Sequence, residues 1–241
     1  MANLETVFGA SKGSEDGEHW LTVSDLMAGL MMVFLFIAIA YMRAVTITTD
    51  ETKKIVAAYE KNQVAILDGL NAEFKDDLTA WGASIDKNTL SFEFNSPEVL
   101  FDLGESTLKP EFQNILVDFI PRYLGVLQQF KANINEVRIE GHTSPEWGPD
   151  THPDDAYFFN MALSQNRTRS VLSFAYFKTL LSKRQREWVK TSFAAVGLAS
   201  SKFGLKNNDN ENNEKGRRVS FRVITNADKE ISKIISRLLK E

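Results

Sequence analysis

The sequence predicts an α+β protein with a single N-terminal transmembrane helix, an amphipathic linker helix, and a domain in which helices back a mixed sheet. An uncharged apolar run near the N-terminus, a helical apolar stripe after it, and short alternating segments beyond residue 85 support this fold class. The expected parts are a tail over 1–19, the transmembrane helix over 20–43, the linker over 44–84, the domain over 85–226 and a C-terminal helix over 227–241.

Leu26–Met42 is the apolar run LMAGLMMVFLFIAIAYM, without a charge or a proline. Together with residues 20–25 it exceeds the roughly 20 residues that a helix needs to cross a bilayer. The alternative is a cleaved signal peptide. We disfavour it because the preceding tail is acidic and no small-residue cleavage site follows Arg43. The segment is therefore expected to be a retained transmembrane helix.

Asp25 lies about five residues into the expected span 20–43, roughly 7 Å from its start at 1.5 Å per helical residue. An acid within a membrane segment is costly and marks a functional site by default. The neighbouring Ala28 and Gly29 are small enough to let another helix approach closely. We therefore predict that Asp25 carries a proton and that membrane helices of another subunit complete the path. The alternative is a boundary residue of a helix that begins at Leu26.

The linker carries a narrow apolar stripe at helical spacing. Its members are Ile55, Tyr59, Ile66, Leu70, Phe74, Leu78 and Trp81. Such a stripe suits either a paired helix in a homodimer or a helix lying on the domain that follows. We favour pairing.

The remaining segments alternate between strand and helix. Apolar residues alternate with polar ones at about 90–94, 137–141, 193–196 and 217–225, which indicates strands. Helical patterns cover about 110–127, opened by Pro110, and 157–181. This order predicts one mixed sheet backed by helices. The segment Asn207–Glu214 is too polar to bury and is expected to be a loop.

Composition excludes several classes of site and partner. The net charge of −4 disfavours a nucleic acid as partner, because phosphate-binding domains are normally basic. The absence of cysteine removes disulfides, thiolate metal sites and cysteine nucleophiles. The histidines, His19, His142 and His152, are too scattered to predict a zinc site.

The residues around Asp25 resemble the single span of MotB, the ion-carrying stator subunit of the flagellar motor. Trp20-Leu-Thr-Val-Ser-Asp25-Leu-Met27, followed by Phe34 and Phe36, carries this resemblance. In that family an aspartate after a tryptophan carries the proton, which corresponds to Asp25 here.

Four blocks of the C-terminal part resemble OmpA-like peptidoglycan-binding domains. They are FDLGESTL at 101–108, VRIEGHT at 137–143, NMALSQNR at 160–167 and GRRVSF at 216–221. The resemblance implies that Arg167 clamps a carboxylate of the peptide stem, as suits a bidentate guanidinium. It implies further binding residues, which are Thr143, Ser144, Phe159, Asn160 and Leu163. Without the other blocks, Leu163 could equally be core and Arg167 a solvated helix residue.

The chain departs from the OmpA-like pattern in the segment after Thr143. That family normally has an aspartate there, which pairs with the amine of diaminopimelate, whereas this chain has Ser144. The following loop is longer than usual and carries Glu146, Asp150, Asp154 and Asp155. Either one of these acids replaces the aspartate, or Asp150, Asp154 and Asp155 bind a cation such as calcium. No other cofactor or metal is predicted.

The expected orientation follows from wall binding, which requires the periplasm. Lys12 before the span and Arg43, Lys53 and Lys54 after it weakly favour the opposite orientation by the positive-inside rule. A large domain can be translocated despite such weak flanking charges. We therefore expect a single-pass inner-membrane protein with a cytoplasmic N-terminus and a periplasmic domain.

Within this group, the acidic tail and the extended loop are most similar to the B subunits of Zorya anti-phage defence systems. The resemblance implies a homodimer threaded through a ring of five MotA-like partners, which forms a proton-driven motor anchored to peptidoglycan. The alternatives are a flagellar stator subunit and a passive membrane-to-wall tether. An enzyme is disfavoured because His142 and Ser144 lie two residues apart and no nucleophile elbow is present.

Overall fold

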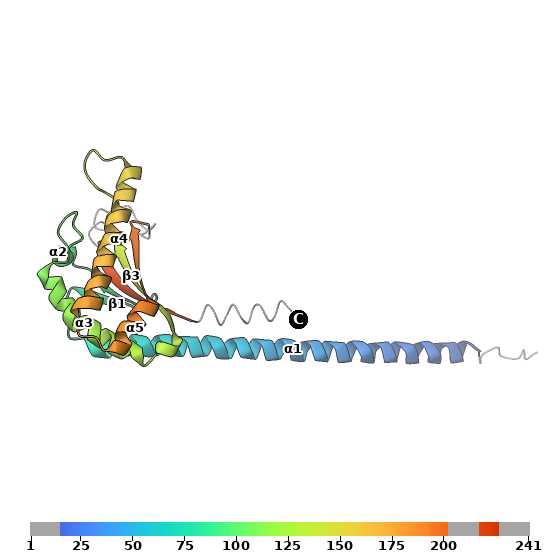
Figure 1. Cartoon of the computed structure of the whole chain (residues 1–241). Coiled ribbons are helices and arrows are strands. Elements are labelled where there is room, and N and C mark those ends of the chain that lie inside the picture. Colours follow the sequence, from blue (N-terminus) through green and yellow to red (C-terminus); the bar gives the residue numbers. More distant parts are fainter. Residues whose placement is uncertain (1–14, 202–216, 227–241) are drawn as a thin grey trace, which may run out of the picture. The chain divides into compact units, whose positions relative to one another are not determined.

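The computed structural model describes residues 15–201 and 217–226, which divide into two compact units at residues 54 and 55 (Figure 1). Helix α1 is assigned to Glu15–Phe74. In the first unit it contains Val23–Ile47, which by length and composition can cross a membrane, with a mean hydropathy of 2.3. It is the one such segment among the described residues, and it overlaps the predicted span.

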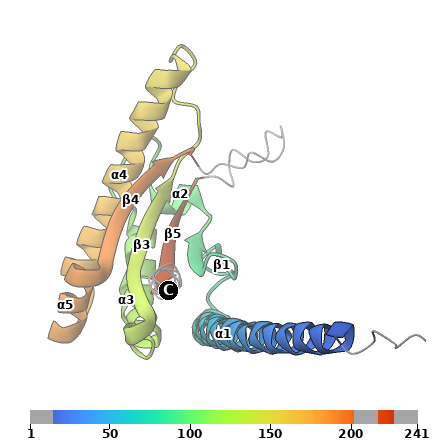
Figure 2. The same cartoon turned by 90° about the vertical axis from the view of Figure 1, so that its right-hand side faces the viewer.

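The second unit is α+β with one mixed sheet, as predicted (Figure 2). Its elements are β1 (Ala83–Asp86), β2 (Ser91–Phe94), α2 (Pro97–Leu100), α3 (Pro110–Gln128), a 3-10 turn η1 (Lys131–Asn133), β3 (Ile134–His142), α4 (Pro153–Lys178), α5 (Lys183–Ser192), β4 (Phe193–Ala199) and β5 (Arg218–Thr225). The strand order is β1-β2-β5-β3-β4, in which β3 and β4 are parallel and all other neighbours antiparallel. The predicted helix over 227–241 and the loop over 207–214 lie outside the described residues.

One face of the sheet packs against α3 and α4 and forms an aromatic core (Figure 2). Phe92, on β2, lies 4.7 Å between ring centroids from Phe119 on α3, and Phe119 stacks on Tyr123 at 4.8 Å. Tilted and edge-on arrangements predominate in this cluster, as the quadrupoles of aromatic rings favour. The strand residues that face the core alternate with polar ones, because successive side chains of a strand point to opposite faces.

The apolar stripe of the linker was predicted to pair with a second copy of the chain. This prediction is wrong for the part of the stripe from Ile66 onwards. Ile66, Leu70 and Phe74 are completely buried in the core of their own domain. The helix also ends at Phe74 instead of continuing to Trp81. Leu78 and Trp81 follow in turns and pack against the same core. The alternative, a helix lying on the domain that follows, is therefore correct for these residues.

Some short elements were not predicted, namely β1, α2 and α5. The α5 helix nevertheless has a readable start signal, a capping box between Ser182 and Gln185. The Ser182 hydroxyl accepts a hydrogen bond from the Gln185 amide at 3.3 Å, and the Gln185 side chain accepts one from the Ser182 amide at 2.9 Å. A serine followed three residues later by a glutamine therefore indicates in the sequence where α5 begins.

Candidate functional site

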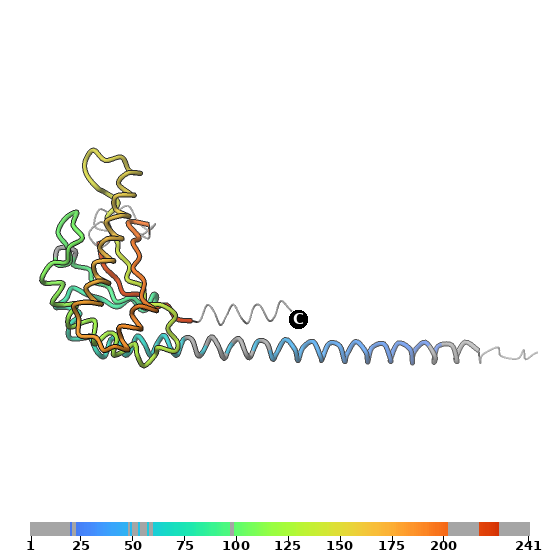
Figure 3. The backbone as a smooth tube through the Cα atoms, viewed as in Figure 1, coloured from blue at the N-terminus to red at the C-terminus, as the bar shows by residue number. Residues whose placement is uncertain are grey.

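A cavity of about 360 Å³ lies where the 100–109 segment, the end of β3, the start of β5 and the first half of α4 meet. Figure 3 traces the backbone, with the 101–109 loop in green and the 143–152 loop in yellow. The volume is in the range of ligand-binding pockets. The lining residues come from four separate parts of the chain: Leu100 to Gly104 and Lys109; Gly141 to Ser144 with Glu146 and Trp147; Asn160, Leu163 and Arg167; and Arg217 to Val219.

The structure brings most of the predicted wall-binding residues together at this pocket. Five of them line it: Thr143, Ser144, Asn160, Leu163 and Arg167. Phe159 does not line the pocket, and its ring lies 5.4 Å from that of Trp147, which does. Asp25 belongs to the other compact unit, on α1, with an exposed side chain.

Glycines in two strands allow α4 to lie close to the sheet and thereby position its pocket residues. A Cβ on Gly141 would lie 2.8 Å from the Ser164 carbonyl oxygen, and one on Gly197 would lie 2.5 Å from the Gln165 nitrogen. The helix side chains that face these strands are small and polar as well as buried. The Ser164 hydroxyl, for example, accepts a hydrogen bond from the Ala199 amide at 3.2 Å. The apolar pattern of the sequence did not reveal this polar part of the helix face.

Arg167 is held by carbonyl oxygens in place of carboxylates. Its Nε donates to the Glu105 carbonyl at 2.8 Å and its Nη2 to the Asp102 carbonyl at 3.1 Å. Its Cζ lies 4.8 Å from the centroid of the Phe101 ring, within cation–π range. Burial, and then the charge of Arg217, lower the pKa of the Arg167 guanidinium to about 10. Because its charged form is disfavoured there, an anion bound beside it would be strongly stabilised.

Two further polar atoms of the pocket have no hydrogen-bond partner within the described residues. The Thr143 hydroxyl and the Nε of Arg217 are buried and make no hydrogen bond there. Buried polar groups are normally hydrogen-bonded, so such atoms are available to a ligand. Two other basic side chains of the lining lie in ion pairs: Lys109 with Asp102 at 3.3 Å, and Arg218 with Glu93 at 3.3 Å.

Of the acids in the long loop, Glu146 lines the pocket and the aspartates do not. The Asn160 side chain donates to the Glu146 carbonyl at 2.9 Å, which ties the loop to α4. Asp154 and Asp155 lie in the first turn of α4, where negative charge interacts favourably with the helix dipole. No group of three acids or histidines that could hold a metal forms among the described residues, so the cation hypothesis gains no support.

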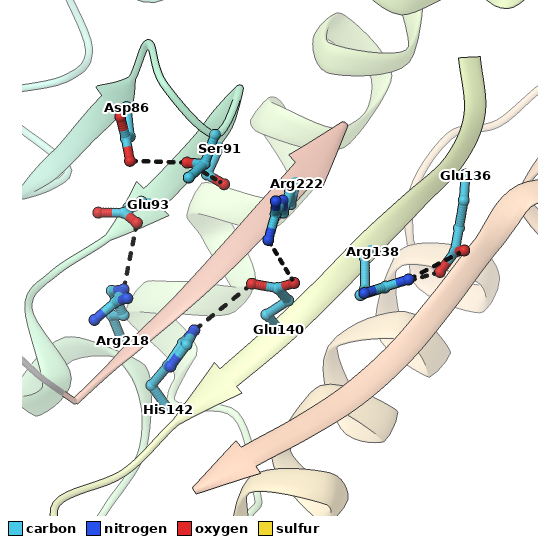
Figure 4. Close-up of polar contacts among 10 residues, drawn as sticks. Asp86, Ser91, Glu93, Glu136, Arg138, Glu140, His142, Arg218 and Arg222 are labelled. Atoms are coloured by element: carbon cyan, nitrogen blue, oxygen red, sulfur yellow. Dashed lines mark hydrogen bonds and ion pairs between the residues drawn. The ribbon is translucent and has the colours of Figure 1, made fainter. Parts of the chain in front are cut away.

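The opposite face of the sheet carries ion pairs between neighbouring strands (Figure 4). Arg222 lies 3.8 Å from Glu140, and Glu140 lies 3.8 Å from the Nε2 of His142. His142 thus contacts Glu140, while the Ser144 hydroxyl donates to the Glu146 carbonyl at 3.5 Å. In the described part of the chain these contacts do not form the hydrogen-bonded base and nucleophile that a hydrolase requires.

Sequence reasoning did not select several residues that line the pocket: Asp102, Lys109, Trp147 and Arg217. Asp102 and Arg217 lie inside the recognised blocks and could have been found there. Trp147 lies in the loop that departs from the OmpA-like pattern, and only the folded chain brings it to the pocket.

Comparison with known proteins assigns the family. The chain is 52% identical over 225 residues to the Zorya protein ZorB of Escherichia coli strain ATCC 8739, a match that covers 93% of this chain and 95% of that protein. The chain belongs to the ZorB family. A second ZorB, from Escherichia coli O139:H28, is 24% identical over 226 residues, covering 90% of this chain and 85% of that protein. The predicted resemblance to Zorya B subunits is therefore confirmed.

Among solved structures, a MotB-like protein from Desulfovibrio vulgaris is similar at 20% identity with a TM-score of 0.49, covering 68% of this chain and 95% of that one. No protein-family model matches the chain. The family assignment thus rests on the sequence match to ZorB.

Proposed function

We propose that this ZorB-family chain is a MotB-like subunit of a proton-driven inner-membrane motor, which is anchored to peptidoglycan and acts in anti-phage defence with a MotA-like partner. The proposed assembly is a homodimer within a ring of five partner subunits. Its part is mechanical and ion-carrying, without catalysis. The N-terminus lies in the cytoplasm and the domain in the periplasm.

The observation that carries the wall-binding part is the basic pocket in a chain of negative net charge. Arg167 and Arg217 line it, and Arg167 has no carboxylate within ion-pair distance among the described residues. A peptide-stem carboxylate would accept hydrogen bonds from a guanidinium in a partly desolvated site, which strengthens such pairs. Thr143 adds an unpartnered buried hydroxyl.

Glu146 is the acid we propose for the role of the missing aspartate at Ser144. It lines the pocket, and its backbone is fixed by Asn160 from α4. A carboxylate at the mouth of a basic pocket would favour a ligand that carries both a carboxylate and an amine, as diaminopimelate does. Asp150, Asp154 and Asp155 do not line the pocket.

The proton-carrying part is supported by the position of Asp25 within the apolar segment Val23–Ile47. No other Asp, Glu, Lys or Arg is present until Arg43, so Asp25 is isolated in the sequence of the span. Its side chain is exposed on α1, as a residue that faces a partner subunit must be in the isolated chain. An acid in this place can load and release a proton only if partner helices supply a path for it.

The experiment that tests the motor is phage protection in cells that carry the intact operon with Asp25→Asn. Asparagine is nearly isosteric with aspartate but cannot cycle a proton, so we expect loss of protection with normal membrane expression and unchanged binding to purified cell walls. Ser24→Ala, at the neighbouring position, is the control and should protect like the wild type.

Full protection by Asp25→Asn would show that Asp25 is a boundary residue and would favour the passive tether. Support of swimming by the wild-type operon, without protection against any phage, would favour the flagellar stator subunit.

A further inference from the structure

The rim of the pocket carries exposed aromatic side chains from two segments. Trp147, in the loop after β3, is 44% exposed, and Phe159, on the first half of α4, is 48% exposed. Their ring centroids lie 5.4 Å apart at an interplanar angle of 49°. Large apolar groups gathered at the surface beside a pocket mark a binding surface more often than scattered ones do.

Contacts from pocket residues hold this aromatic pair in place. Asn160, which follows Phe159, donates to the carbonyl of Glu146, which precedes Trp147, at 2.9 Å. A turn closed by the Thr151 amide and the Gly148 carbonyl at 3.2 Å follows Trp147. The two rings are therefore positioned together with the pocket instead of on an independent loop.

We propose that Trp147 and Phe159 form a platform on which a sugar ring of the glycan strand stacks while the peptide stem occupies the pocket. This inference rests on the proposed function, since it assumes that the pocket takes the stem. It adds a second subsite, for a neutral carbohydrate, to the ligand of that site.

The volume of the pocket and the chemistry of the aromatic pair favour placing the peptide stem in the pocket and the sugar on the two rings. A cavity of about 360 Å³ is at the small end of ligand pockets, so a stem peptide leaves no room for the disaccharide to which it is attached. The covalently attached sugar then lies outside the cavity, where Trp147 and Phe159 offer exposed aromatic faces. The C–H bonds on one face of a sugar ring carry partial positive charge, and they suit the negative faces of aromatic rings.

The platform also explains a difference between the two parts of the site. The pocket presents charges from Arg167 and Arg217, whereas the rim pair presents no charge at all. A protein partner that covered only these rings would bury far less area than a stable protein interface needs. A saccharide continuous with the bound stem needs only the stacking surface itself.

The test compares ligands that differ only in the sugar. The full-length protein, purified in detergent, is titrated with a disaccharide–tetrapeptide muropeptide and with the free tetrapeptide. We expect the muropeptide to bind about tenfold more tightly, which corresponds to stacking of the size measured for aromatic pairs. Because Trp147 also lines the pocket, the readout is the ratio of the two affinities. Trp147→Ala should weaken muropeptide binding more than peptide binding and bring this ratio close to one, while Trp147→Phe should retain most of it.

Phe177→Ala is the matched control, because Phe177 is also an exposed aromatic residue of α4, at 68%, and does not line the pocket. It should bind both ligands like the wild type.

Equal wild-type affinity for both ligands, or equal weakening of both by Trp147→Ala, would overturn the platform and leave the stem pocket standing. Binding of the muropeptide but not the peptide, abolished by Trp147→Ala, would retain the platform and overturn the pocket. Binding of neither would overturn both.

Discussion

Two arginines of this domain have similar aromatic neighbours and opposite electrostatic surroundings. Arg122 lies 4.7 Å from the Phe74 ring centroid, and Arg167 lies 4.8 Å from that of Phe101. Arg122 contacts three carboxylates, those of Glu73, Asp77 and Asp118, at 2.7–2.8 Å. Among the described residues, the hydrogen-bond partners of Arg167 are the Glu105 and Asp102 carbonyl oxygens.

The pKa values of the two side chains differ accordingly. Burial opposes the charged form of Arg122, but its hydrogen bonds to Glu73, Asp77 and Asp118 outweigh this effect and raise its pKa. For Arg167, burial and the nearby Arg217 lower the pKa to about 10. Arg122 also donates to the Glu73 carbonyl at the end of α1, at 2.7 Å. Arg122 therefore stabilises the junction of α1 with α3, whereas the charge of Arg167 has no carboxylate partner among the described residues.

The largest expected effect is the loss of peptidoglycan binding when Arg167 in the pocket is replaced. Arg167→Ala should weaken binding of the full-length protein to purified peptidoglycan by about 100-fold, because loss of a desolvated charge pair has effects of this size. Its melting temperature without ligand should change little, because the loss of the hydrogen bonds to the Glu105 and Asp102 carbonyls opposes the removal of an unfavourably placed charge. Arg167→Lys should be intermediate, because an ammonium cannot make the bidentate contact. Sedimentation with cell walls measures the affinity, and wild-type binding by Arg167→Ala would contradict the anion site.

The second prediction concerns Arg122 at the junction of α1 with α3, where a substitution should lower stability and leave ligand binding almost unchanged. Arg122→Ala should lower the free energy of unfolding by about 2 kcal/mol, roughly 4–8 °C in melting temperature, because three carboxylates lose their common partner. Peptidoglycan affinity should change by less than about twofold, because the two sites share no contact partner. Thermal unfolding and the same sedimentation assay measure both quantities. If Arg122→Ala melts like the wild type, the stabilisation by these ion pairs is fully offset by the cost of removing the charged groups from water.

The smallest effect concerns the opposite face of the sheet, where Glu93 pairs with Arg218. Burial raises the pKa of Glu93, with Asp86 adding to this effect and Arg218 opposing it. A raised carboxyl pKa means that the folded state favours the protonated form, so the contribution to stability is present at low pH and is lost as the pH rises through the raised pKa.

Glu93→Gln should therefore be neutral or stabilising at pH 7, by less than about 1 kcal/mol. This advantage over the wild type should shrink as the pH falls towards the ordinary pKa of glutamate. Melting temperatures of both proteins across this pH range test the prediction. A clear destabilisation at pH 7 would show instead that the pairing with Arg218 outweighs the effect of burial.

Much of the fold followed from local sequence patterns. The apolar run predicted the transmembrane segment, and the helix opened by Pro110 matches α3, because both depend on residues close in sequence. Four blocks far apart in sequence predicted the pocket, and five of the six proposed wall-binding residues line it. Their roles in binding remain predictions.

Only the tertiary structure shows which part of the molecule covers an apolar face or contacts a charged side chain. A helical stripe shows that one face of the linker must be covered, but not by what. The burial of Ile66, Leu70 and Phe74 shows that the domain itself covers that part. In the same way, the sequence contains Arg122 and Arg167 as similar residues on predicted helices. Only long-range folding brings Glu73 and Asp77 to Arg122 and the carbonyl oxygens of the 102–105 segment to Arg167. Periodicity is a property of neighbouring residues, whereas the partner of a side chain depends on chain segments that folding brings together.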